Sequence, residues 1–196
     1  MTAVDLAPGL GDYHLWIGRA WVATGDDAEA SAALTKAIEL SPENVEAWLA
    51  RAELELGRKR PKAALADLQQ AYFLDSKRVA LLELMAETYI ELGDKKKALT
   101  FLHEAVAVTP SAESWFKIGK LQAEAGKLKD SAASLNKAVD LLDTHADAWF
   151  LLGFVYRELH QRGDAKRAFE KFLKVAPPDH PDAAEARDQV FDLTGG

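Results

Sequence analysis

The chain contains no cysteine among its 196 residues. Without thiols it cannot form a disulfide scaffold, a thiolate zinc site or a cysteine nucleophile. It has no apolar run near the ~18 residues that a membrane-spanning helix needs. Its N-terminal residues have neither a basic head nor a long apolar stretch, so no signal peptide is predicted. Together these absences favour a cytoplasmic protein with no membrane insertion.

Basic residues are the minority among the charged ones. The 24 Lys and Arg residues face 31 Asp and Glu residues, which gives a net charge of −7. This balance disfavours broad binding to nucleic acid phosphates or to an anionic membrane. Hydrophobic residues make up 48% of the chain and charged residues 28%, which are ordinary globular proportions and exclude a disordered class.

Catalytic motifs are also missing. The sequence has neither the Gly-x-x-x-x-Gly-Lys-Ser/Thr phosphate loop nor the Gly-x-Ser-x-Gly elbow. No two of its five histidines have metal-ligand spacing on a helix. His145 and Asp147 could together touch a cation, although solvated residues at a repeat junction are the preferred interpretation. We therefore predict no enzyme activity, no cofactor and no metal.

What the sequence does have is an internal repeat. Ala30, Leu34 and Ala37 have the same spacing as Ala98, Leu102 and Ala105. A short motif that begins with leucine or valine also recurs every 33 to 34 residues. Its five copies end at Pro42, Ser76, Pro110, Asp143 and Pro177. Self-similarity at this period is the signature of a stacked repeat architecture.

The pattern resembles the tetratricopeptide repeat, a helix–turn–helix unit of about 34 residues. Five repeats are assigned, at 11–44, 45–78, 79–111, 112–145 and 146–179. The residues that match the family's first-helix aromatic are Trp48, Trp115 and Trp149, and those that match its small close-packing residue are Gly18, Ala52, Ala86, Gly119 and Gly153.

The resemblance implies an all-α fold, a right-handed superhelical solenoid of antiparallel helix pairs. Residues 1–10 are interpreted as a loosely held N-terminal lead-in, and 180–196 as a C-terminal capping helix and tail. Within the cap, Ala183, Ala186, Val190 and Leu193 form an apolar stripe opposite charged residues. Such a polar-faced helix closes the end of a stack.

Glycine occupies the turn between the two helices in three repeats, at Gly25, Gly93 and Gly126. A glycine there suits a left-handed helix C-cap. Lys59 and His160 stand in its place in the second and fifth repeats. The expected second aromatic of the first helix is likewise replaced in two repeats, by Glu55 and Gln122.

In this family the first helices line a concave groove that holds a protein partner. Positions 2, 5, 9, 12 and 13 of each repeat share one helical stripe, because steps of three and four keep to one face. The resemblance, with Trp16 added at the neighbouring position 6, predicts partner-binding residues at Leu15, Trp16, Arg19, Leu49, Glu53, Glu83, Glu87, Phe116, Lys120, Phe150, Phe154 and Arg157.

The groove residues predict what the partner contains. Glutamates dominate the middle repeats, which favours a partner segment with basic residues there. Phe116, Phe150 and Phe154 near the C-terminal end favour an apolar anchor beside Lys120 and Arg157. The predicted function is a non-catalytic adaptor that binds a partner peptide or protein surface in the groove.

Blander interpretations stay open at several of these positions. The glutamates could be a plain solvated face. Phe150 and Phe154 could be groove-floor packing, and Trp16 could be covered by Leu6 or Leu10 of the lead-in. The alternative function is a self-assembling homo-oligomeric scaffold in which the groove accepts another copy of the chain.

The intra-repeat turns carry the opposite charge. Basic residues cluster there, at Arg58, Lys59, Arg60, Lys62, Lys95, Lys96, Lys97, Lys127, Lys129, Arg162, Lys166 and Arg167. Equivalent turns of a solenoid align along one edge, so a basic ridge is expected. It could serve solubility and helix-end charge complementarity, or it could be a second docking edge for an acidic protein surface.

Overall fold

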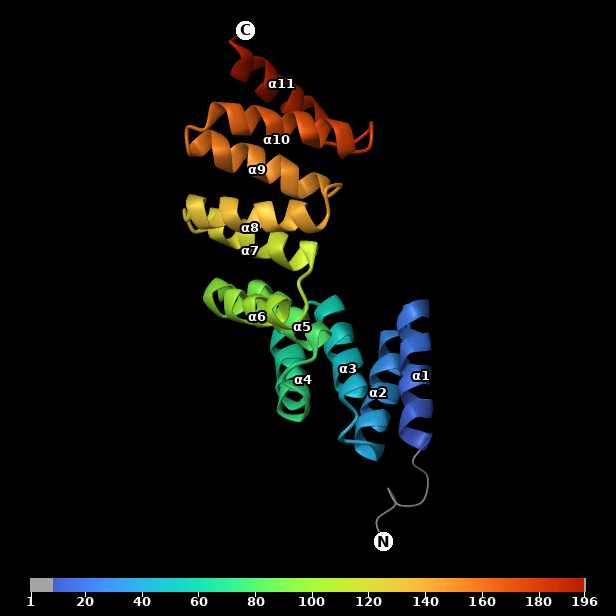
Figure 1. Cartoon of the computed structure of the whole chain (residues 1–196). Coiled ribbons are helices and arrows are strands. Elements are labelled where there is room, and N and C mark those ends of the chain that lie inside the picture. Colours follow the sequence, from blue (N-terminus) through green and yellow to red (C-terminus); the bar gives the residue numbers. More distant parts are fainter. Residues whose placement is uncertain (1–8, 196) are drawn as a thin grey trace. The chain divides into compact units, whose positions relative to one another are not determined.

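The computed structural model describes residues 9–195, and within that range every regular element is an α-helix. The all-α class is therefore confirmed (Figure 1). The helices are α1 (Gly9–Thr24), α2 (Asp27–Leu40), α3 (Val45–Gly57), α4 (Pro61–Leu74), α5 (Val79–Glu91), α6 (Lys95–Val108), α7 (Ala112–Glu124), α8 (Leu128–Leu141), α9 (Ala146–Glu158), α10 (Arg162–Val175) and α11 (Ala183–Thr194).

The helices form two compact units that divide within α6, between Ala105 and Val106. In each unit, consecutive helices pair across short turns and successive pairs stack, as Figure 1 shows. The expected lead-in falls mostly on residues 1–8, which lie outside the described residues. Gly9 and Leu10 belong to α1, so the helix begins before the repeat boundary expected at residue 11.

Prolines and capping side chains mark where the helices end and begin. Pro42, Pro110 and Pro177 each follow the last residue of a second helix by two residues, because proline cannot continue the hydrogen-bonded ladder. At the next helix start, the Asn44 side chain accepts a hydrogen bond from the Glu46 backbone N–H at 3.0 Å. Ser111 caps α7 in the same way.

The turns inside the pairs use left-handed backbone. Gly25, Gly93 and Gly126 have φ between 72° and 84°, as the C-cap prediction requires. Lys59 and His160 adopt the same conformation, with φ of 57° and 59°. The turn geometry is thus kept where glycine is not, at the steric cost that a Cβ meets in this region.

The predicted close-packing glycines are needed for helix contact. A Cβ added at Gly153 would lie 2.6 Å from the Phe169 ring, which is closer than real Cβ atoms come. The equivalent additions at Gly18 and Gly119 would meet leucine side chains at the same distance. These glycines let the two helices of a pair approach until the large residue of the second helix covers the first.

Each unit has its own apolar core. In the first unit, Leu34 and Ala37 of α2 pack with Ala47, Ala50 and Leu54 of α3. In the second unit, α8 and α9 form one cluster, and Phe169 and Phe172 of α10 form another with α11. The predicted apolar stripe of the cap contributes Ala186, Val190 and Leu193 to this last cluster. Phe169 and Phe172 are fully buried in this cluster, so the contact with α11 stabilises the unit.

Candidate partner-binding surfaces

A pocket of about 290 Å³ lies on the first-helix surface of the first unit, between α3 and α5. Its walls carry the carboxylates of Glu53, Glu87 and Glu91, and Lys59 stands at its rim. The Lys59 Nζ lies 3.5 Å from Glu91 Oε1, and the lysine side chain is largely exposed. Leu56 and Leu84, which are half-buried, also line the pocket, so the site combines apolar and acidic side chains.

The two predicted glutamates of α5, Glu83 and Glu87, have different surroundings. Glu87 is exposed and lines the pocket, whereas Glu83 is half-buried and lies outside it. The structure thus brings two of the predicted residues, Glu53 and Glu87, to one pocket.

Arg19 is held in an ionic bridge that spans three consecutive first helices. Its Nη2 lies 2.5 Å from Glu46 Oε2, and the other carboxylate oxygen of Glu46 accepts from Arg78 at the start of α5. A second bond, from Asn44 Nδ2 to Asp12 Oδ1 at 2.9 Å, runs beside the bridge. Since Glu46 already satisfies both arginines, this part of the surface has less free charge than its sequence suggests.

Leu15 and Leu49 are not on this surface. They are 5% and 4% exposed and belong to the core, so the prediction that they contact a partner is corrected. The physical reason is the helical register. Leu15 shares a face with Gly11 and Gly18, which lie four residues before it and three after it and are both buried. An apolar side chain at this border position turns inward.

In the second unit, Phe116 of α7 packs against the His145 ring, with centroids 4.8 Å apart. His145 caps α9 by accepting a hydrogen bond from the Ala148 N–H, and its Nε2 lies 3.5 Å from Glu113 Oε2. Phe116 is half-buried and Lys120 is exposed, four residues further along the same helix. His145 thus serves as a helix cap beside the candidate anchor.

Phe150 and Phe154 contribute to the aromatic core of the second unit. Their rings lie 5.0 Å apart, and each contacts Phe169, with centroids at 6.0 Å and 5.0 Å. Arg157 stacks over Phe154 at 4.9 Å and donates from Nη1 to Gln189 Oε1 on α11 at 2.7 Å. The three residues hold α9, α10 and α11 together, and both phenylalanines keep part of their surface exposed.

Trp16 is one of the most exposed large apolar residues described, with 67% of its surface accessible. Leu10 belongs to α1 and is itself exposed. The alternative in which Leu6 covers Trp16 lies outside the described residues.

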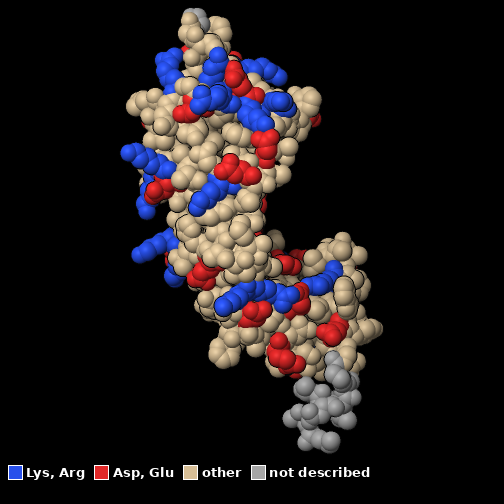
Figure 2. All heavy atoms as spheres, viewed as in Figure 1, with Lys and Arg blue, Asp and Glu red and all other residues tan. Residues whose placement is uncertain are grey.

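Several of the basic turn residues are paired with acids of the same unit. Arg58 and Arg60 both reach Glu55, at 3.1 Å and 3.7 Å, and Lys97 reaches Asp94 at 3.5 Å. Figure 2 shows Lys and Arg intermixed with Asp and Glu over the face it draws. Two of the arginines thereby neutralise the nearly buried Glu55, which explains how a carboxylate replaces the expected aromatic at that position.

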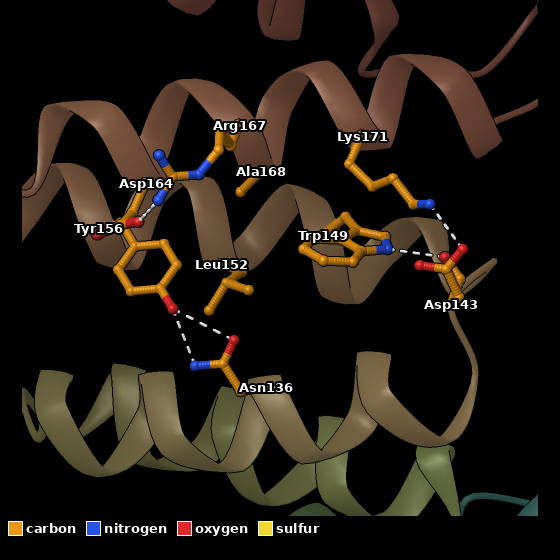
Figure 3. Close-up of a pocket in the computed structure, with 9 residues that line it drawn as sticks. All are labelled: Asn136, Asp143, Trp149, Leu152, Tyr156, Asp164, Arg167, Ala168 and Lys171. Carbon is orange, nitrogen blue, oxygen red and sulfur yellow. Dashed lines mark hydrogen bonds and ion pairs between the residues drawn. The ribbon is translucent and has the colours of Figure 1, made fainter.

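A second pocket, of about 390 Å³, lies among α8, α9 and α10 and was missed by the sequence reasoning (Figure 3). The Trp149 indole and the Tyr156 ring stand on either side of Leu152 and Ala168. The Trp149 Nε1 donates to the Asp143 backbone oxygen at 2.8 Å.

Polar side chains complete the rim of this second pocket. Lys171 Nζ lies 2.6 Å from Asp143 Oδ2, and Arg167 pairs with Asp164. Asn136 Nδ2 donates to the Tyr156 hydroxyl at 2.9 Å. Its charged groups are already matched in pairs, so the pocket has no net charge to offer a ligand.

The equivalent place in the first unit also has a pocket, of about 330 Å³, whose lining includes Arg51 and Asp67. There Arg51 and Asp67 stand where Leu152 and Ala168 stand in the fifth repeat. The Arg51 guanidinium donates to both Asp67 carboxylate oxygens, at 2.9 Å and 2.7 Å, and to Thr35 Oγ1 at 3.1 Å. The Asp67 hydrogen bond raises the pKa of Arg51, because the paired carboxylate favours the charged guanidinium.

Among residues 9–195, no group of three or more His, Asp or Glu side chains is placed to hold a metal ion. Over the same range, the helices are too short or too polar to cross a lipid bilayer.

Four models of tetratricopeptide repeats match the sequence, over residues 17–78, 55–118, 112–141 and 146–179. No curated protein matches it. Among solved structures, the MamA protein has a TM-score of 0.78 at 20% identity, with 92% of this chain and 96% of that chain covered.

Two further structures are similar to a comparable degree. PilF of Pseudomonas aeruginosa has a TM-score of 0.76 at 18% identity, over 98% of this chain and 90% of that one. YrrB, described as a TPR protein with an unusual peptide-binding site, has a TM-score of 0.75 at 22% identity, over 89% and 90% of the two chains. At these identities the likeness shows the fold. The sequence models and the helix pairs agree, and the chain belongs to the tetratricopeptide repeat family.

Proposed function

We propose that this protein is a non-catalytic cytoplasmic adaptor that binds a basic segment of a partner protein on its first-helix surface. The observation that carries the proposal is the pocket between α3 and α5, which is lined by Glu53, Glu87 and Glu91 together with Leu56 and Leu84. A lysine or arginine side chain fits this combination, because its methylene stem can lie on leucine while its charged head meets carboxylates.

Two further features support this choice of surface. The pocket contains one base, Lys59, whose exposed side chain can move aside at little cost because surface ion pairs are weak. The fold itself is compatible with peptide binding, since the similar YrrB structure is described as having a peptide-binding site.

The second unit offers an apolar anchor of its own at Phe116, beside Lys120. Phe116 is held by the His145 ring and keeps part of its surface accessible, as an interface anchor requires. Phe150 and Phe154 contribute their remaining exposed surface, while most of each ring serves the core.

The test is selection of peptides from a random library on the immobilised full chain, followed by affinity measurement by calorimetry. We expect the selected peptides to be rich in Lys and Arg, and Glu53→Gln with Glu87→Gln to weaken binding by about tenfold or more. The matched control is Glu29→Gln with Glu43→Gln, two exposed glutamates outside the pocket.

Binding should also weaken as salt rises, because the attraction is between exposed charges. Selection of acidic or uncharged peptides, or equal losses in the pocket variant and its control, would contradict the proposal.

A further inference from the structure

One face of α1 is exposed and is made of residues without charge. It consists of Gly9, Tyr13, Trp16, Ala20 and Ala23, which are spaced by three and four residues and therefore share one side of the helix. Tyr13 is 58% exposed and Trp16 67%, and Ala20 and Ala23 are also exposed. This set is called the α1 face below.

The equivalent face is buried in the next repeat of the same unit. Ala47, Ala50 and Leu54 of α3 stand 34 residues after Tyr13, Trp16 and Ala20 and are packed in the core cluster with α2. That position in the repeat is thus built to be covered by another helix. On α1, no part of the chain that the structure describes covers it.

The α1 face nevertheless differs from a repeat junction. The α2–α3 junction has alanine at the two leading positions, whereas α1 has Tyr13 and Trp16. Large aromatics with a polar edge are enriched at protein interfaces. Both are also held in place, since Arg19 lies over Trp16 at 5.7 Å and His14 packs edge-on to Tyr13 at 5.6 Å. Side chains ordered before association lose less entropy on binding.

The order of sizes along the α1 face is self-complementary. Two copies of α1 can pair antiparallel about a two-fold axis that passes level with Gly18. Trp16 of one copy then stands opposite Ala20 of the other, and Tyr13 stands opposite Ala23. Each large side chain meets a small one, as close packing of two helices requires, and the pairing repeats on both sides of the axis.

We propose that a second copy of this chain occupies the α1 face and forms a symmetric antiparallel dimer. The surface area that this dimer would bury is small, which favours weak association. An aromatic side chain presents roughly 150–250 Å² when fully buried, so four that are more than half exposed supply roughly 500 Å². The alanines and the flanks of two helices bring the total near the ~1,000 Å² that a specific interface needs. We expect a dissociation constant on the order of micromolar.

The experiment is sedimentation velocity of the full chain from about 0.1 µM to about 100 µM, a range that brackets micromolar affinity. We expect the mass to rise with concentration from 21.5 kDa towards twice that value. Trp16→Asp should remain monomeric throughout. Phe73→Asp is the control, because Phe73 is 87% exposed and lies on α4, away from the α1 face, so this variant should dimerise like the parent.

Exchange of the large and small residues at positions 16 and 20 tests which residues of the two α1 helices lie opposite each other. Ala20→Trp alone places tryptophan opposite tryptophan and should abolish the dimer. Combination of Ala20→Trp with Trp16→Ala restores a large residue opposite a small one and should recover it. A chain that is monomeric at every concentration overturns the proposal, as does a dimer that survives Trp16→Asp or Ala20→Trp. These residues lie outside the acidic pocket, so failure here leaves the peptide-binding proposal standing, and the reverse also holds.

Discussion

At the scale of single residues, two turns keep a left-handed backbone conformation although they have no glycine. Lys59 and His160 hold φ values near 58° that glycine adopts freely and other residues adopt at a cost. The neighbouring turns with Gly25, Gly93 and Gly126 have the same backbone hydrogen bonds, so packing of the pair fixes the turn. The sequence shows the substitution, and only the structure shows that the geometry is retained.

His160→Gly should therefore stabilise the protein by about 0.5–1 kcal/mol, since the strain in the left-handed region exceeds the added backbone entropy of glycine. Lys59→Gly should act in the same direction, reduced by the loss of its weak pair with Glu91. Urea unfolding of each variant measures the change. The reverse substitution, Gly126→Ala, should destabilise, and a loss of stability in His160→Gly would show that the turn is not strained.

At the scale of helices, the pairing could be predicted because glycine and proline mark the boundaries and small residues mark the contacts. The predicted close-packing role of Gly153 is visible as the absence of room for a Cβ beside Phe169.

The site was predicted less well. Leu15 and Leu49 sit on the border of the groove stripe, where one step of register decides between surface and core. The pocket in Figure 3 depends on how side chains of α8, α9 and α10 come together, and one-dimensional periodicity does not record such contacts.

Gly153→Ala should lower the free energy of unfolding by about 1–3 kcal/mol, because the new Cβ forces the Phe169 ring or the backbone to move. Gly163→Ala is the matched control. Gly163 lies in the first turn of α10, and the nearest atom to an added Cβ is 3.9 Å away. This variant should be neutral or slightly stabilised, as alanine favours helix. Thermal unfolding of both variants decides the matter, and equal effects would mean that the α9–α10 contact is looser than described.

At the scale of the whole molecule, stability is distributed between two units with separate cores. In repeat proteins each element contacts its neighbours, so stability is close to a sum of local terms. The architecture could be predicted from the repeat, since the period and the small-residue pattern recur in every unit. The division within α6 could not be predicted, because Lys95–Val108 has neither glycine nor proline to mark a break.

Phe172→Ala, which removes a fully buried ring, should reduce hydrogen-exchange protection in α9, α10 and α11 more than in α1 to α4. Leu34→Ala, in the core of the first unit, should do the opposite. Mass spectrometry of backbone amide exchange resolves the two regions. A uniform loss of protection along the chain in either variant would indicate a single cooperative unit.

The Arg51–Asp67 pair limits how freely these repeats can be exchanged. Proteins of this architecture lend themselves to duplication and shuffling of whole modules, because each module presents the same frame to its neighbours. Here Asp67 is buried on α4 and its partner is on α3, within one module, while Thr35 of the preceding module completes the guanidinium's hydrogen bonds. A recombination break between α3 and α4 that joined Asp67 to the leucine of the fifth module would strand a carboxylate in the interior. Recombination at module boundaries keeps Arg51 and Asp67 together and leaves no buried carboxylate unpaired. Electrostatics as well as packing therefore favours exchange of intact helix pairs.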